Sequence, residues 1–157
     1  MFFSNTDVSM RRYVLGMAVA SLIPSALIAI ILAAVGIIDE ESRPVFEGSA
    51  LFLLTSTLML APAIETLAMS AMLWLLSFCT KRIMPLAVVS ALIWAGLHSL
   101  ATPVWGLTVL WPFFVFSYSY LTWWEKSWWH AVWVAFWIHV FQNLLPGVMV
   151  AVIDGGI

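Results

Sequence analysis

Residues 83–124 read IMPLAVVSALIWAGLHSLATPVWGLTVLWPFFVFSYSYLTWW, a run of 42 residues without one Asp, Glu, Lys or Arg. A bilayer core about 30 Å thick is crossed by roughly 20 apolar residues in a helix. The run is therefore long enough for two membrane spans joined by a turn. Because proline favours the first turn of a helix, Pro85 suggests where the first helix begins, and Ala101-Thr102-Pro103 marks where it ends. We expect one helix from about Met84 to Ala101 and the next from about Trp105 to Trp124.

Three further segments of the chain are also long and almost free of Asp, Glu, Lys and Arg. Residues 13–38 and 127–153 contain no charged side chain, and residues 48–80 contain one, Glu65. They predict helices at about Tyr13–Ile38, at Ser49–Cys79 with an interruption at Pro62, and at Trp128–Ile153 with a kink or break at Pro146-Gly147. The chain lacks the alternation of apolar and polar residues that a membrane barrel requires. The sequence thus predicts an all-α, polytopic membrane bundle of about five helices, in a single domain over residues 1–157.

Composition agrees with this prediction. Hydrophobic residues make up 64% of the chain, six basic and eight acidic residues supply all its charge, and the mean hydropathy is +1.05. Soluble domains carry about 25% charged residues. Nucleic-acid binding needs a basic surface, and disorder needs low hydrophobicity. A soluble domain, a disordered chain and a nucleic-acid-binding protein are therefore excluded. With Cys79 as its one cysteine, the chain forms no internal disulfide.

The basic residues predict the orientation, since cytoplasmic segments are enriched in Lys and Arg. An inside N-terminus places five basic residues inside and one, Arg43, outside; the five are Arg11, Arg12, Lys81, Arg82 and Lys126. We expect an integral protein of a prokaryotic cytoplasmic membrane, in contact with lipid. The tryptophans around the 125–127 turn are expected to form an interfacial aromatic belt. These are Trp123, Trp124, Trp128 and Trp129, with His130 also interfacial.

Four polar residues lie where a membrane span should be apolar: Glu65, His98, His139 and Asn143. A charge at the centre of a membrane helix costs about 2.5–3.5 kcal/mol, so such residues are rare and face the bundle interior. Glu65, His98 and Asn143 lie 14–16 residues from the inside ends of their helices. At 1.5 Å per residue this is a depth of roughly 21–24 Å. His139 is one turn shallower, so all four can meet near the midplane.

Local spacing places these groups on common helix faces. His139 and Asn143 are four residues apart, as are Trp94 and His98, and residues at this spacing share one face of a helix. Small residues flank Glu65 and His98, which favours close helix packing. We therefore expect the helices of residues 48–80, 83–101 and 127–153 to pack with the four polar groups inward.

Such a set can perform acid–base chemistry. A carboxyl and an imidazole can remove a proton from water and later protonate a leaving amine. A second imidazole and an amide can donate hydrogen bonds to a developing oxyanion.

No HExxH motif occurs, and no Asp lies inside a predicted span. A metal-free site is favoured, with zinc held by Glu65, His98 and His139 as the alternative. Each polar residue, taken singly, could instead be a hydrogen-bonding clamp between helices.

In these residues the chain resembles the CAAX-protease and bacteriocin-processing family of intramembrane proteases, which includes the type II CAAX prenyl endopeptidases. The family pattern is Glu-Glu-x-x-x-Arg, then Phe-x-x-x-His, then His-x-x-x-Asn or Asp. Here these motifs begin at Glu65, Trp94 and His139, with Thr66 and Ser70 in place of the second Glu and the Arg. The resemblance covers residues 48–153, and residues 1–47 add an N-terminal helix and loop.

The resemblance implies an intramembrane glutamate-type endopeptidase. Glu65 would be the general base, His98 would orient or polarise water, and His139 with Asn143 would form the oxyanion hole. Thr66, Ser70 and Trp94 would contact the substrate, which would be a peptide or protein. Lipidated and leader-bearing proteins are among the candidate substrates. The changes at Thr66 and Ser70 motivate an alternative: a catalytically silent relative that acts as an immunity factor, a proton relay or a partner-binding subunit.

Overall fold

The computed structural model describes residues 6–38 and 44–155, and every regular element within them is helical. This confirms the all-α prediction. The elements are α1 (Met10–Ala34), α2 (Ala50–Thr55), the π-helical turn η3 (Ser56–Leu60), α3 (Ala61–Leu76), α4 (Ile83–Ser99), α5 (Pro103–Trp124) and α6 (Trp128–Ile153). Because α2, η3 and α3 form one continuous rod, five rods correspond to the five predicted helices.

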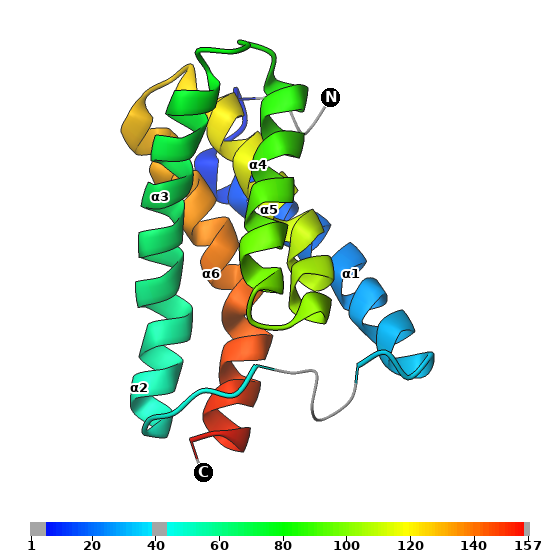
Figure 1. The fold of residues 1–157 in the computed structure, drawn as a ribbon. Helices are drawn as coiled ribbons and strands as arrows, with labels where there is room; N and C mark the ends of the chain where they lie inside the picture. The colour runs from blue at the N-terminus through cyan, green and yellow to red at the C-terminus, as the bar shows by residue number, and fades with distance from the viewer. Residues whose placement is uncertain (1–5, 39–43, 156–157) are drawn as a thin grey trace.

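Four of these rods are long and apolar enough to cross a membrane: α1, the rod Ala50–Leu76, α5 and α6. The fifth, α4, is equally apolar but has only 17 residues. The chain is therefore an integral membrane protein. Its α4–α5 turn stops well short of the end of the bundle at which α2 begins and α6 ends (Figure 1).

Most basic residues lie at one end of the bundle. The start of α1, the 77–82 connection and the 125–127 turn lie together (Figure 1), and Lys126 Nζ donates to the carbonyl of Thr6. We call this the basic end, because it carries Arg11, Arg12, Lys81, Arg82 and Lys126. The opposite end holds residues 44–49 and the end of α6 (Figure 1). Residues 39–43, with Arg43, lie outside the described residues.

Helix α5 runs through the middle of the core. Phe113, Phe116 and Tyr120 are each at most 2% exposed and pack with residues of the other helices. Gly106 lets α4 and α5 approach closely, since a Cβ there would overlap the carbonyl oxygen of Ala95 and the hydroxyl of Ser99. This tight hairpin fixes the position of the α4 C-terminus, where His98 lies.

The tryptophans near the 125–127 turn divide into two groups. Trp124, Trp128 and Trp129 are exposed, as an aromatic belt requires, while the indole N–H of Trp128 turns inward to Ser70. The prediction is wrong for Trp123, which is 2% exposed and lies edge-to-face on Tyr13 with ring centroids 5.3 Å apart. The contact with α1, which sequence spacing does not show, makes Trp123 a core residue.

The two prolines expected to interrupt helices behave differently. Pro62 lies in the first turn of α3, directly after η3. Because proline has no N–H, it cannot bond to the carbonyl four residues before it, and the π turn is the local adjustment. At Pro146, where the sequence predicts a kink or a break, the helix does not break, since α6 continues to Ile153. Packing between neighbouring membrane helices stabilises a proline-containing helix, and here Gly147 packs closely on Thr57 and Leu58 of η3.

Candidate functional site

Glu65 and His139 meet in the interior of the bundle. His139 Nε2, on α6, lies 3.6 Å from Glu65 Oε2, on α3. This separation is longer than a hydrogen bond but within the range of an ion pair. The side chain of His139 is 5% exposed and that of Glu65 is 24% exposed. The carboxyl is therefore the more open member of the pair.

Aromatic rings from α5 enclose His139. The ring of Phe116 stacks on its imidazole, with centroids 4.4 Å apart and an interplanar angle of 25°. The ring of Phe113 meets it edge-on at 5.6 Å. These rings exclude water from one side of His139, and electrostatic interactions are stronger where water is excluded. The imidazole thus has a polar neighbour in Glu65 and apolar neighbours on α5.

His98, at the end of α4, also contacts Phe113. Its ring centroid is 5.1 Å from that of Phe113 and 4.7 Å from that of Trp105. His98 Nδ1 is 2.9 Å from the carbonyl oxygen of Trp94. Because a carbonyl can only accept, Nδ1 carries the proton of this bond, and Nε2 is the acceptor nitrogen of the neutral ring. Phe113 thus contacts both imidazoles, and His98 makes no ion pair with Glu65 within the described part of the chain.

Asn143 engages the backbone of η3. Its Nδ2 donates to the carbonyl oxygen of Thr57 over 3.1 Å. A π turn leaves carbonyls outside the regular helical pattern, so an amide from a neighbouring helix is a suitable partner. A primary amide nitrogen carries two N–H groups, and the bond to Thr57 uses one of them. Asn143 is therefore tied to the rod that carries Glu65, two turns before that residue.

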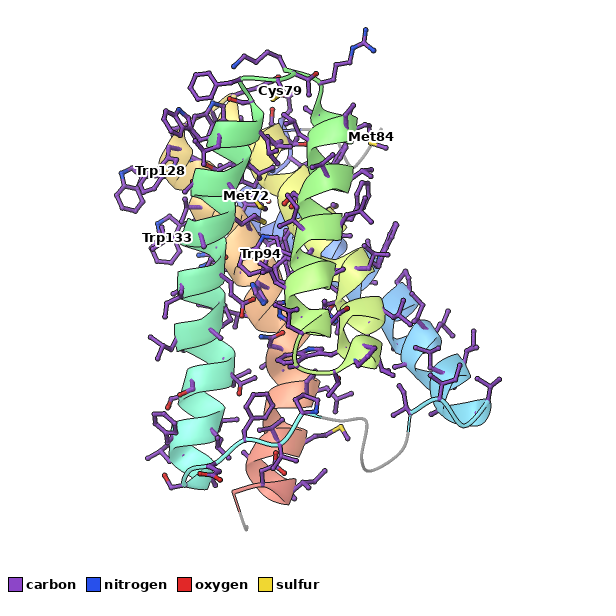
Figure 2. All side chains as sticks on the ribbon, in the orientation of Figure 1. Met72, Cys79, Met84, Trp94, Trp128 and Trp133 are labelled. Carbon is purple, nitrogen blue, oxygen red and sulfur yellow. The ribbon has the colours of Figure 1, made fainter. Side chains whose placement is uncertain are left out.

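The three predicted substrate-contacting residues lie in the packed interior. Thr66 is 2% exposed, Ser70 is 6% exposed and Trp94 is 9% exposed. Figure 2 shows Trp94 between α3 and α4, and its ring stacks on Phe113 with centroids 4.7 Å apart. The hydroxyl of Thr66 and the indole N–H of Trp94 are buried without a hydrogen-bond partner among the described residues. Unpartnered buried polar atoms are uncommon and indicate where a water or a ligand could bind.

Ser70 stands where the motif that the chain resembles has an arginine. Its hydroxyl has two hydrogen-bond partners. Its hydroxyl lies 2.6 Å from the hydroxyl of Tyr120 and accepts a 2.9 Å hydrogen bond from Trp128 Nε1. These bonds connect α3, α5 and the start of α6. Ser70 therefore joins three helices near the basic end.

The residues considered for zinc do not assemble into a ligand set. Within residues 6–38 and 44–155, no three His, Cys, Asp or Glu side chains are grouped so that they could hold a metal ion. Of Glu65, His98 and His139, all within the described residues, only Glu65 and His139 form an ion-pair contact, with 3.6 Å between Oε2 and Nε2.

Sequence reasoning missed two features around the site. Phe113 and Phe116 carry no charge, and nothing distinguishes them from the other aromatics of α5. Gln142 did carry a signal, because it is a polar residue at membrane depth next to Asn143. Its Oε1 accepts from Ser21 Oγ over 2.7 Å, and its Nε2 donates to Ser25 Oγ over 2.9 Å, so it joins α1 to α6.

The resemblance carried by Glu65, His98, His139 and Asn143 rests on these short motifs alone. No protein-family model, curated protein or solved structure matches this chain.

Proposed function

We propose that the chain is an intramembrane glutamate-type endopeptidase. The observation that carries the proposal is the approach of His139 Nε2 to within 3.6 Å of Glu65 Oε2. A carboxyl and an imidazole at this separation can exchange a proton directly after a small shift or through one water. Catalytic hydrogen bonds are often long before substrate binds.

In the proposed reaction, Glu65 accepts a proton from water, and the water oxygen attacks the carbonyl carbon of a peptide bond. His98 Nε2 is the acceptor that orients this water, because Nδ1 is bound to the Trp94 carbonyl. The proton held between Glu65 and His139 then moves to the leaving nitrogen, and the C–N bond breaks. This is general acid–base catalysis by one carboxyl–imidazole pair.

The tetrahedral intermediate requires hydrogen-bond donors near its oxyanion. Asn143 has a second amide N–H besides the one that binds Thr57, and His139 can donate from its imidazole. The unpartnered atoms of Thr66 and Trp94 are the donors that we assign to binding of the peptide itself. The substrate is then a peptide or protein segment that enters the membrane, and lipidated or leader-bearing proteins are the candidate class.

The test is a comparison of new protein N-termini in membranes from cells that produce the wild type or the Glu65→Gln variant. Glutamine keeps the size of the side chain but cannot accept the proton. We expect cleavage products with the wild type and none with the variant. Glu47→Gln, in the exposed segment before α2, is the matched control and should leave cleavage unchanged. Cleavage by Glu65→Gln at the wild-type rate would contradict the proposal.

A non-enzymatic role is the second candidate. The observation that favours it is that His98 Nδ1 and Asn143 Nδ2 are each engaged by a backbone carbonyl, as in a structural clamp. On this alternative, Glu65→Gln changes binding of a partner or proton flux, and no cleaved product appears with the wild type. The same comparison of N-termini therefore separates the two candidates.

We also propose that the basic end faces the cytoplasm of a prokaryotic cell. The five basic residues at that end support this orientation through the positive-inside rule. Labelling of Cys79, which is exposed in the 77–82 connection (Figure 2), by a membrane-impermeant thiol reagent tests it. We expect labelling only after the membrane is opened.

A further inference from the structure

A groove opens between α3, α4 and α5 near the basic end of the bundle, and Glu65, His98 and His139 are not among its lining residues. Its volume is about 380 Å³, within the range of about 300–1,000 Å³ that is typical of ligand pockets. Leu73 on α3, Leu86 on α4 and Leu121 on α5 contribute apolar walls. The groove is therefore suited to a hydrocarbon chain.

The mouth of this groove is on the outer surface of the bundle. Trp74 and Phe78 line it and are 55% and 70% exposed, and their rings meet edge-to-face with centroids 5.1 Å apart. In a chain whose other helices span the membrane, an exposed apolar opening at this position faces lipid. A lipid can thus enter the groove sideways from the bilayer.

The polar end of the groove carries two opposite charges. Lys81 and Glu125 both line it, one from the 77–82 connection and one from the turn after α5. Lys81 Nζ donates to Ser77 Oγ over 3.3 Å and lies 5.8 Å from the ring centroid of Phe78. Within the described residues no ion pair joins Lys81 to Glu125. The groove therefore presents an ammonium and a carboxylate that are each available to a ligand.

We propose that this groove binds a phosphatidylethanolamine molecule of the surrounding bilayer. Its phosphate pairs with Lys81, its primary ammonium pairs with Glu125, and one acyl chain lies among Leu73, Leu86 and Leu121. The two opposite charges favour a zwitterionic headgroup, and the N–H donors of a primary ammonium favour ethanolamine over choline, because charge-assisted hydrogen bonds are stronger than contacts without a donor. A phosphoglycerol headgroup offers no cation to Glu125, and a phosphocholine ammonium carries no N–H to donate. The inference is independent of the proposed peptidase activity.

The experiment measures lipid retention by native mass spectrometry of the purified chain in detergent. The chain is loaded with phosphatidylethanolamine, phosphatidylcholine or phosphatidylglycerol of identical acyl composition. We expect the wild type to retain phosphatidylethanolamine best. Glu125→Gln should lower its retention by about fivefold, the upper end for one exposed ion pair, and should lower the retention of phosphatidylcholine less. Lys81→Gln should lower the retention of all three lipids.

Lys126→Gln is the matched control, because Lys126 lies at the same end but binds the Thr6 carbonyl and does not line the groove. It should keep the wild-type pattern. Leu121→Trp, which fills the groove, should reduce phosphatidylethanolamine retention in a protein that still elutes as folded. Equal retention of the three lipids by the wild type, a preference for phosphatidylglycerol, or equal losses in Lys81→Gln and Lys126→Gln would overturn the proposal. So would unchanged retention by folded Leu121→Trp.

Discussion

His139 Nε2 lies 3.6 Å from Glu65 Oε2, so the one acidic side chain inside the spans faces an imidazole from another helix. Their energetic coupling can be measured by a double-mutant cycle with Glu65→Gln and His139→Asn. Residues in contact show coupling energies of about 0.5–3 kcal/mol. We expect a coupling in this range in the free energy of unfolding, measured with a denaturing detergent. Strictly additive effects would show that the two groups do not interact.

The close approach of α4 and α5 predicts contrasting effects at two glycines of this hairpin. Gly106→Ala should destabilise the fold by about 1–3 kcal/mol, because the new methyl group overlaps the Ala95 carbonyl. Gly96→Ala is the control, since no atom lies within 4 Å of a Cβ built there. It should be neutral or slightly stabilising, because alanine favours helix more than glycine. Thermal unfolding of the two purified variants distinguishes them, and equal stabilities would contradict this packing.

Ser70 should matter more than Ser77, the half-buried serine that directly follows α3. Ser70→Ala leaves the hydroxyl of Tyr120 and the indole N–H of Trp128 without their shared partner. An unsatisfied buried polar group costs about 1–3 kcal/mol, so we expect a clear fall in the midpoint of thermal unfolding. Ser77→Ala removes a hydroxyl whose hydrogen bond to the carbonyl of Trp74 is exposed to solvent, and it should change the midpoint little. A larger effect at Ser77 would refute the role of Ser70.

The hydrogen bonds of Gln142 should stabilise the packing of α1 against α6. Ser21→Ala removes the donor to Gln142 Oε1, and Gln142→Leu removes both of its bonds to α1. Hydrogen bonds between membrane helices contribute about 0.6 kcal/mol on average and up to about 1.7 kcal/mol. Each variant should be destabilised within this range, and the double variant should lose less than the sum. Chemical denaturation of all three variants checks this, and a full sum would indicate that the two side chains act separately.

Much of the fold follows from the chain's charge pattern. The charge-free runs and the polar connections between them predict all five helices, because lipid excludes charged residues from a span. The pairing of Glu65 with His139 agrees with the expectation from depth and spacing. The partner of Asn143 could not be predicted in this way, because the π turn at Ser56–Leu60 places the Thr57 carbonyl toward α6.

Two further features depend on tertiary packing. Phe113 and Phe116 were not predicted at the site, because an aromatic residue in an apolar helix is equally compatible with a core or a lipid-facing position. Trp123 was predicted at the interface and is buried, with its ring edge-to-face on Tyr13 of α1. Pattern alone therefore identified the polar groups of the site but not the rings that surround them.

We propose that Glu65 accepts the proton of the water that hydrolyses a peptide bond. The most direct measurement is the incorporation of ¹⁸O into new C-termini of membrane proteins when the reconstituted chain acts in H₂¹⁸O. Hydrolysis transfers the water oxygen to the carboxyl product. We expect labelled C-termini with the wild type and none with Glu65→Gln. Equal labelling by the two proteins, or none from the folded wild type, would contradict the account.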